Sequence, residues 1–147
     1  MDFAQKGYSL IDSVKYEEAV EAFSRAIAEN PGTKAAYIGR CIANSYLGKH
    51  EQVVEDCSSA IELDPDDAVL YRSRGAAYDR LGKHEQAVKD YHKALELNPN
   101  DVVSYVRRGF SYEILGDKEN ALKDLITAAR FGHEPAQDYL RSEGIEW

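Results

Sequence analysis

The stretch LGKHEQAVKDYHKALELNP (81–99) decides the fold, because it is a second copy of LGKHEQVVEDCSSAIELDP (47–65). The two copies begin 34 residues apart, and each ends in a proline that follows Asp or Asn. A weaker copy begins at Leu115, and a partial one ends at Pro31. A fixed period of this length indicates repeated units that stack on one another, rather than a single globular core.

Other positions keep the same spacing along the chain. They form sets of prolines, tyrosines and alanines: Pro31, Pro65 and Pro99; Tyr37, Tyr71 and Tyr105; Ala26, Ala60, Ala94 and Ala128. A fourth proline would fall where His133 stands, so the repeat decays there. We therefore expect four units, over about 1–33, 34–67, 68–101 and 102–134.

The second unit predicts two helices. Residues such as Tyr37, Cys41 and Asn44 form a stripe at helical spacing over 34–47, after which Gly48 offers a left-handed stop. A second stripe runs over 50–63. It ends at a proline, which disfavours a helical residue before it and lacks a backbone donor.

The other units follow the same plan. Their helices are expected over 68–81 and 84–97, then over 102–115 and 118–131. The first unit is shorter, because Val14 and Lys15 stand in place of the glycine turn. A last stripe over about 135–142 begins with Pro135, which suits a first helical turn. We interpret it as a capping helix that covers the end of the stack.

These units resemble the tetratricopeptide repeat, whose period and sequence pattern they share. The third unit matches the pattern best, with Tyr71, Gly75, Tyr78, Ala87, Tyr91, Ala94 and Pro99. The second unit departs most, since Cys41 replaces a glycine and Cys57 replaces an aromatic residue. The resemblance implies an all-α, right-handed α-solenoid of about four helical hairpins plus a C-terminal capping helix, in a single domain over 1–147.

The resemblance also implies a function. In proteins of this family the first helix of each repeat lines a concave face, where peptide segments of partner proteins dock. The chain is therefore expected to be a non-catalytic adaptor or scaffold that binds a protein or peptide. Carried onto this sequence, the groove positions are Tyr8, Ile38, Ile42, Tyr46, Arg72, Ala76, Arg80, Val106, Arg107, Phe110 and Ile114.

Alternatives stay open at this point. Several groove residues could instead pack against adjacent helices. The chain could be a domain from a larger enzyme or secretion component, or it could self-associate through an exposed end repeat. The clamp with which some co-chaperones of this family grip a C-terminal carboxylate is not expected, because only Arg107 fits its residue pattern.

Composition narrows the partners. A net charge of −8 and a pI near 5.0 argue against binding to a nucleic-acid backbone. No apolar run approaches the roughly 20 residues that a membrane span needs. The first residues lack the basic-then-apolar build of a signal peptide, so we expect a cytoplasmic chain, monomeric or weakly self-associating.

An arginine also recurs in register, at Arg40, Arg74 and Arg108. These side chains could form an anion-binding row. However, an aspartate lies 16 residues after each of them: Asp56, Asp90 and Asp124. A helical hairpin would bring both members to the seam between its helices, so a structural ion pair within each hairpin is the better hypothesis.

No other residues of the sequence indicate a catalytic or metal-binding site. The histidines lack the close spacing of a metal site on one helix, and no phosphate-binding loop or catalytic triad can be singled out. Cys41 and Cys57 fall in one hairpin, where a disulfide between them is geometrically conceivable. In a cytosolic chain, however, reduced and buried thiols are the default. We expect no enzyme activity, metal or cofactor.

Overall fold

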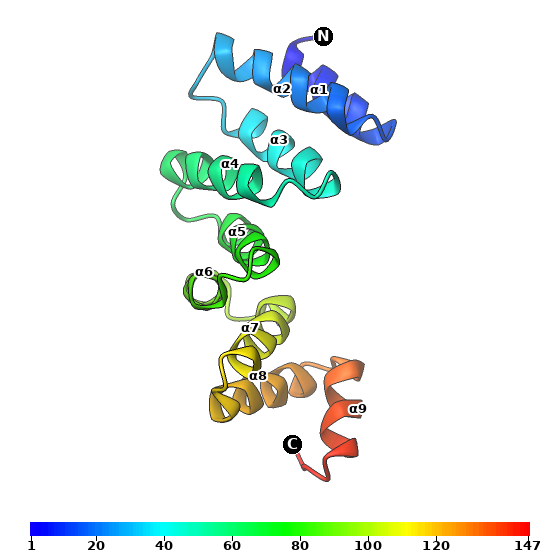
Figure 1. The fold of residues 1–147 in the computed structure, drawn as a ribbon, viewed down its shortest axis with the longest axis vertical. Coiled ribbons are helices and arrows are strands. Elements are labelled where there is room, and N and C mark those ends of the chain that lie inside the picture. Colours follow the sequence, from blue (N-terminus) through cyan, green and yellow to red (C-terminus); the bar gives the residue numbers. More distant parts are fainter.

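A computed structural model describes residues 1–147 and contains nine helices and no strands. The helices are α1 (Phe3–Asp12), α2 (Tyr16–Glu29), α3 (Lys34–Tyr46), α4 (His50–Leu63), α5 (Ala68–Arg80), α6 (His84–Leu97), α7 (Val102–Ile114), α8 (Lys118–Arg130) and α9 (Glu134–Ser142). Successive helices pair and stack along the long axis, with the termini toward opposite ends (Figure 1). The predicted all-α solenoid is confirmed.

The turns explain where the helices end. Gly48, Gly82 and Gly116 follow the first helices of three hairpins with φ between +71° and +81°, a region that glycine adopts without strain. Val14 holds the equivalent place in the first hairpin at φ +59°. His133 stands where the fourth proline would fall, and its Nδ1 accepts a hydrogen bond from the Ala136 amide, so it caps α9.

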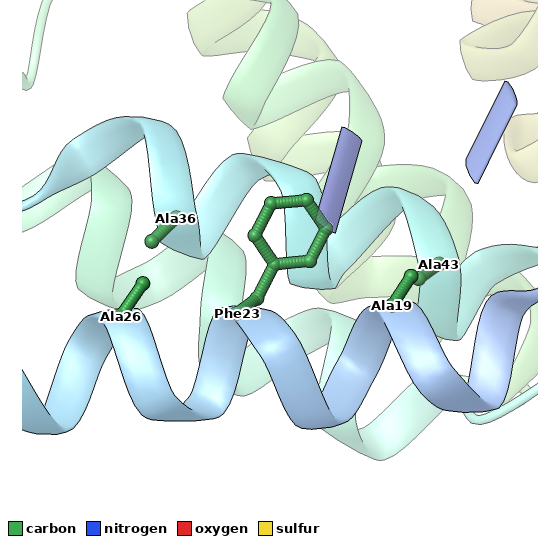
Figure 2. Packing of buried hydrophobic residues seen from close by; sticks show 5 residues of the cluster. All are labelled: Ala19, Phe23, Ala26, Ala36 and Ala43. Atoms are coloured by element: carbon green, nitrogen blue, oxygen red, sulfur yellow. The ribbon is translucent and has the colours of Figure 1, made fainter. Parts of the chain in front are cut away.

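The core is divided into clusters that join successive hairpins. In the first cluster, Ala19, Phe23 and Ala26 of α2 point toward Ala36 and Ala43 of α3 (Figure 2). The last cluster joins α8 to α9, whose Leu140 is fully buried. Each cluster therefore buries the apolar stripe of one hairpin against the next hairpin or, at the end of the stack, against α9.

Large and small side chains alternate in these clusters. The Phe23 ring occupies a notch left by Gly7 and Gly39, where an added Cβ would collide with it. Tyr91 fills the same kind of notch beside Gly75 in the third hairpin. In the second hairpin, two side chains of medium size, Cys41 and Cys57, take the places of the glycine and the aromatic residue. The combined volume is similar, which explains why this departure from the repeat pattern is tolerated.

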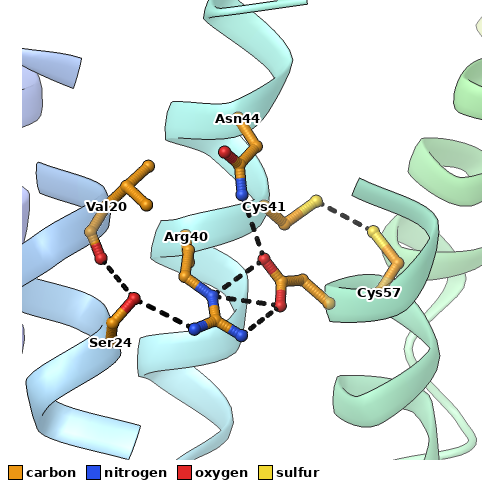
Figure 3. Close-up of polar contacts among 7 residues, drawn as sticks. Val20, Ser24, Arg40, Cys41, Asn44 and Cys57 are labelled. Atoms are coloured by element: carbon orange, nitrogen blue, oxygen red, sulfur yellow. Dashed lines mark hydrogen bonds and ion pairs between the residues drawn. The ribbon is translucent and has the colours of Figure 1, made fainter. Parts of the chain in front are cut away.

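The three arginines in register lie at the seams between helices, as the 16-residue spacing predicts, and Figure 3 shows this for Arg40. Arg74 donates from Nε and Nη2 to the two carboxylate oxygens of Asp90, both at 2.8 Å. Arg40 and Arg108 pair with Asp56 and Asp124 in the same manner. All three carboxylates are buried, so the structural interpretation is confirmed.

Each arginine also reaches back to the preceding hairpin, which was not foreseen. Nη1 of Arg40 donates to Ser24 Oγ at 3.0 Å, and Nη1 of Arg74 donates to Ser58 Oγ at 3.1 Å. Nη1 of Arg108 lies 3.4 Å from His92 Nδ1. One guanidinium therefore connects three helices and sets two hairpins relative to each other.

We expect Gly39→Ala to destabilise the fold, because its methyl group would meet the Phe23 ring, which is fully buried and cannot move aside. Overpacking of this kind costs about 1–3 kcal/mol, which outweighs the gain in helix propensity of about 1 kcal/mol. Gly32→Ala, at an exposed turn where the nearest atom lies 3.4 Å away, is the matched control and should change stability little. Urea unfolding measures both, and equal stabilities would contradict the packing account.

A double-mutant cycle on Arg74→Gln and Asp90→Asn should give a coupling energy of about 1.5–3 kcal/mol, since the pair is charged, bidentate and mostly buried. Lys123 and Glu119 form a similarly short but exposed pair at 2.9 Å and serve as the control, for which a much weaker coupling is expected. Thermal and urea unfolding supply the four free energies of each cycle. Similar coupling in both pairs would show that the seam contributes no more than a surface contact.

Candidate peptide-binding face

The first helices lie side by side in the stack, with α1 against α3 and α5 against α7. Four large apolar side chains at predicted groove positions on α3 and α7 face solvent. Their exposed fractions are 37% for Ile42, 64% for Tyr46, 53% for Phe110 and 64% for Ile114. Arg80 and Arg107 are exposed on α5 and α7. We call these six residues the inner face.

Three other predicted groove residues are half-buried and pack inside the stack. The Tyr8 ring meets Phe23 edge to face at 5.0 Å, and its hydroxyl donates to the Ala35 carbonyl at 2.7 Å. Burial raises the pKa of Tyr8 above its usual value. Ile38 packs against the core cluster of α4, α5 and α6, and Val106 packs against the last cluster, of α8 and α9. These residues hold neighbouring helices together, as the alternative interpretation allowed.

Arg72 also has a structural partner. Its Nη1 donates to both carboxylate oxygens of Asp101 at 3.0 Å, and Asp101 is the buried N-cap of α7. Arg72 stays a predicted groove residue, but its guanidinium is already engaged by a carboxylate. Replacing Arg72 would leave the buried carboxylate unpaired and disturb the stack, so Arg72 is unsuited to testing a groove.

Four of the remaining groove residues line one hollow of about 370 Å³. Tyr46 comes from the end of α3, Ala76 and Arg80 from α5, and Arg107 from α7. The other lining residues are Ser45, Gly48, His50, Val53, Ser73 and Ala77. We call this site the arginine hollow. It draws on three successive hairpins, so it exists only in the stacked chain.

The Tyr46 ring is held in place on its other side. It stacks on Tyr16 at the start of α2, with 4.5 Å between ring centroids and 9° between planes. The ring is still 64% exposed. A large aromatic surface that is already ordered loses little conformational entropy on binding, which favours its use in recognition.

The two cysteines are buried free thiols with their Sγ atoms 2.9 Å apart (Figure 3). The contact with Cys41 and burial raise the pKa of Cys57 far above its usual value. Because the thiolate is the reactive form, this pair is suited to packing and not to nucleophilic chemistry.

No group of His, Cys, Asp or Glu is arranged to hold a metal ion. None of the nine helices has the length and apolar character needed to cross a bilayer.

We expect Cys57 of the folded chain to react with iodoacetamide at pH 8 at least 100-fold more slowly than Cys57 of the chain unfolded by guanidinium. Burial keeps the reagent away from the sulfur and disfavours the reactive thiolate. Mass spectrometry of timed samples measures the rate, with the unfolded chain as the control. Rapid labelling of the folded protein would contradict this account of a buried, unreactive thiol.

Comparison with known proteins agrees with this architecture. Two tetratricopeptide repeat models match the chain, one over residues 68–101 and the other over residues 91–123. No curated protein gives a significant match.

Solved structures of MamA share the fold. One crystal structure of MamA is 23% identical with a TM-score of 0.86, covering 92% of this chain and 79% of that one. A MamA fragment from Desulfovibrio magneticus RS-1 is 21% identical with a TM-score of 0.83, covering 92% and 76%. These likenesses concern the fold alone. Residues 68–123 therefore match tetratricopeptide repeat models, and the 34-residue register and the stacked hairpins continue the same architecture over the rest of the chain.

Proposed function

We propose that this chain is a non-catalytic protein-binding module that holds a segment of a partner protein on its inner face. The observation that carries the proposal is the exposure of large apolar side chains at groove positions of α3 and α7. Stacking buries other large side chains almost completely, namely Phe23, Tyr91 and Leu140. The exposure of the side chains on α3 and α7 is therefore not a general property of large residues in this fold. Apolar side chains gathered on one exposed face are typical of an interaction surface.

The chemistry of the inner face supports binding of a protein segment. It combines tyrosine, phenylalanine and arginine, which are enriched in protein interfaces and at their energetic hot spots. The inner-face residues come from three successive first helices, α3, α5 and α7, and this supports an elongated segment as the ligand. These side chains can bind a segment without any chemical reaction of that segment.

We expect Phe110→Ala and Ile114→Ala to reduce capture of specific partners at least tenfold without unfolding the chain, because both side chains are more than half exposed and lie one turn apart on α7. Immobilised wild type and variants would be compared by quantitative pull-down and mass spectrometry. Partners found this way would then be titrated as purified proteins.

The matched control is Tyr139→Ala. Tyr139 is also a large, exposed side chain, but it keeps the register of Tyr105 rather than that of the groove positions. Circular dichroism melts would show that all three variants are folded. Partners lost equally from all three, or from none, would refute binding on the inner face.

A further inference from the structure

The charges around the arginine hollow are unlike those of the whole chain. None of its ten lining residues is acidic, although the chain has a net charge of −8. Arg80 and Arg107 have no carboxylate partner within 4.0 Å, in contrast to five other arginines: Arg40, Arg72, Arg74, Arg108 and Arg141. Two unpaired guanidinium groups at one hollow leave a local excess of positive charge.

The carboxylate nearest in sequence to these arginines is that of Asp79, and it forms no ion pair with either of them. Asp79 precedes Arg80 in α5, but its oxygens are already engaged by other residues. Oδ2 accepts from the Tyr91 hydroxyl at 2.7 Å, and Oδ1 accepts from Ser111 Oγ at 2.8 Å and lies 2.9 Å from His84 Nδ1. These contacts hold Asp79 against α6 and α7, so neither arginine forms an ion pair with it.

Apart from His50, the remaining walls of the hollow are apolar or small. Val53, Ala76 and Ala77 line it, and the fixed Tyr46 ring stands at its edge. Its volume of about 370 Å³ lies in the range of ligand-binding clefts. A guanidinium binds a carboxylate through two parallel hydrogen bonds, and an apolar wall favours an apolar side chain beside it.

We propose that the arginine hollow binds an acidic peptide segment, whose Asp or Glu side chains pair with Arg80 and Arg107 while an adjacent apolar side chain packs on Ala76 and the exposed Tyr46 ring. This inference rests on the proposed function and names the chemistry of its partner. Recognition uses side-chain carboxylates within the segment and does not need a free chain end.

The test uses fluorescent octapeptides that are acetylated and amidated, so that neither end carries a charge. In one pool glutamate alternates with leucine, valine or phenylalanine, and in the matched pool glutamine replaces glutamate. Fluorescence polarisation with the full chain should show at least tenfold tighter binding of the acidic pool. The difference should shrink as salt rises from 50 to 500 mM, because ion pairs at an open hollow are screened.

The variants Arg80→Gln and Arg107→Gln should each weaken binding of the acidic pool at least fivefold. Arg130→Gln is the control, since Arg130 is an exposed arginine on α8 that also lacks an ion pair. It should leave affinity unchanged. Equal binding of the two pools, or equal loss with the Arg130 variant, would overturn the proposal.

Two further arms separate other occupants. Tighter binding of a fluorescent single-stranded DNA 15-mer than of the acidic pool would assign the arginines to phosphate and overturn the proposal. So would concentration-dependent self-association, measured by light scattering, that both arginine variants abolish. If Phe110→Ala still releases partners while the acidic pool fails to bind, this inference falls and the proposed function stands.

Discussion

The stack depends on a guanidinium group that joins three helices. In the third hairpin Arg74 of α5 holds the buried carboxylate of Asp90 on α6 and reaches back to Ser58 on α4. A buried carboxylate is costly unless it is paired and hydrogen-bonded, so the arginine cannot leave the seam without a large penalty. The hydrogen bonds with Asp90 raise the pKa of Arg74, so the guanidinium keeps its charge.

Further pairs fix the spacing of the hairpins. Lys34 Nζ lies 2.6 Å from Asp64 and 3.0 Å from Asp67, so the start of α3 is tied to the turn between α4 and α5. The hydrogen bond with Asp64 is the main reason that the pKa of Lys34 is raised. The Arg72–Asp101 pair makes a corresponding link one hairpin further on. With the hairpins fixed in this way, Tyr46, Arg80 and Arg107 come together although they belong to three different repeats.

The sequence predicted the helices and the arginine–aspartate pairs because both follow from local spacing. Local spacing does not predict which residue of the adjacent hairpin each side chain contacts. Ser24 and Ser58 keep the repeat spacing and could have been noticed as second partners of the arginines. Arg72 could not be assigned from spacing alone, because its partner is the capping residue of the following repeat.

The candidate site was harder to predict for the same physical reason. A helical register gives the direction of a side chain, but its exposure depends on the size of the residues on the adjacent helix. Tyr8 and Phe110 occupy comparable groove positions, yet Tyr8 is held by Phe23 and the Ala35 carbonyl, while Phe110 remains 53% exposed. Exposure therefore had to come from the packed structure.

The acidic composition and the basic hollow are compatible because charge acts over short distances in salt. At physiological ionic strength the Debye length is about 8 Å, so distant surface carboxylates on the outer helices contribute little to the potential at the arginine hollow. Four of the nine arginines are paired with buried aspartates that the fold requires. Arg80 and Arg107 are left outside this pairing, and net charge alone would have hidden them. The sign of the local charge therefore follows from which carboxylates the fold has already engaged, and not from the composition of the chain.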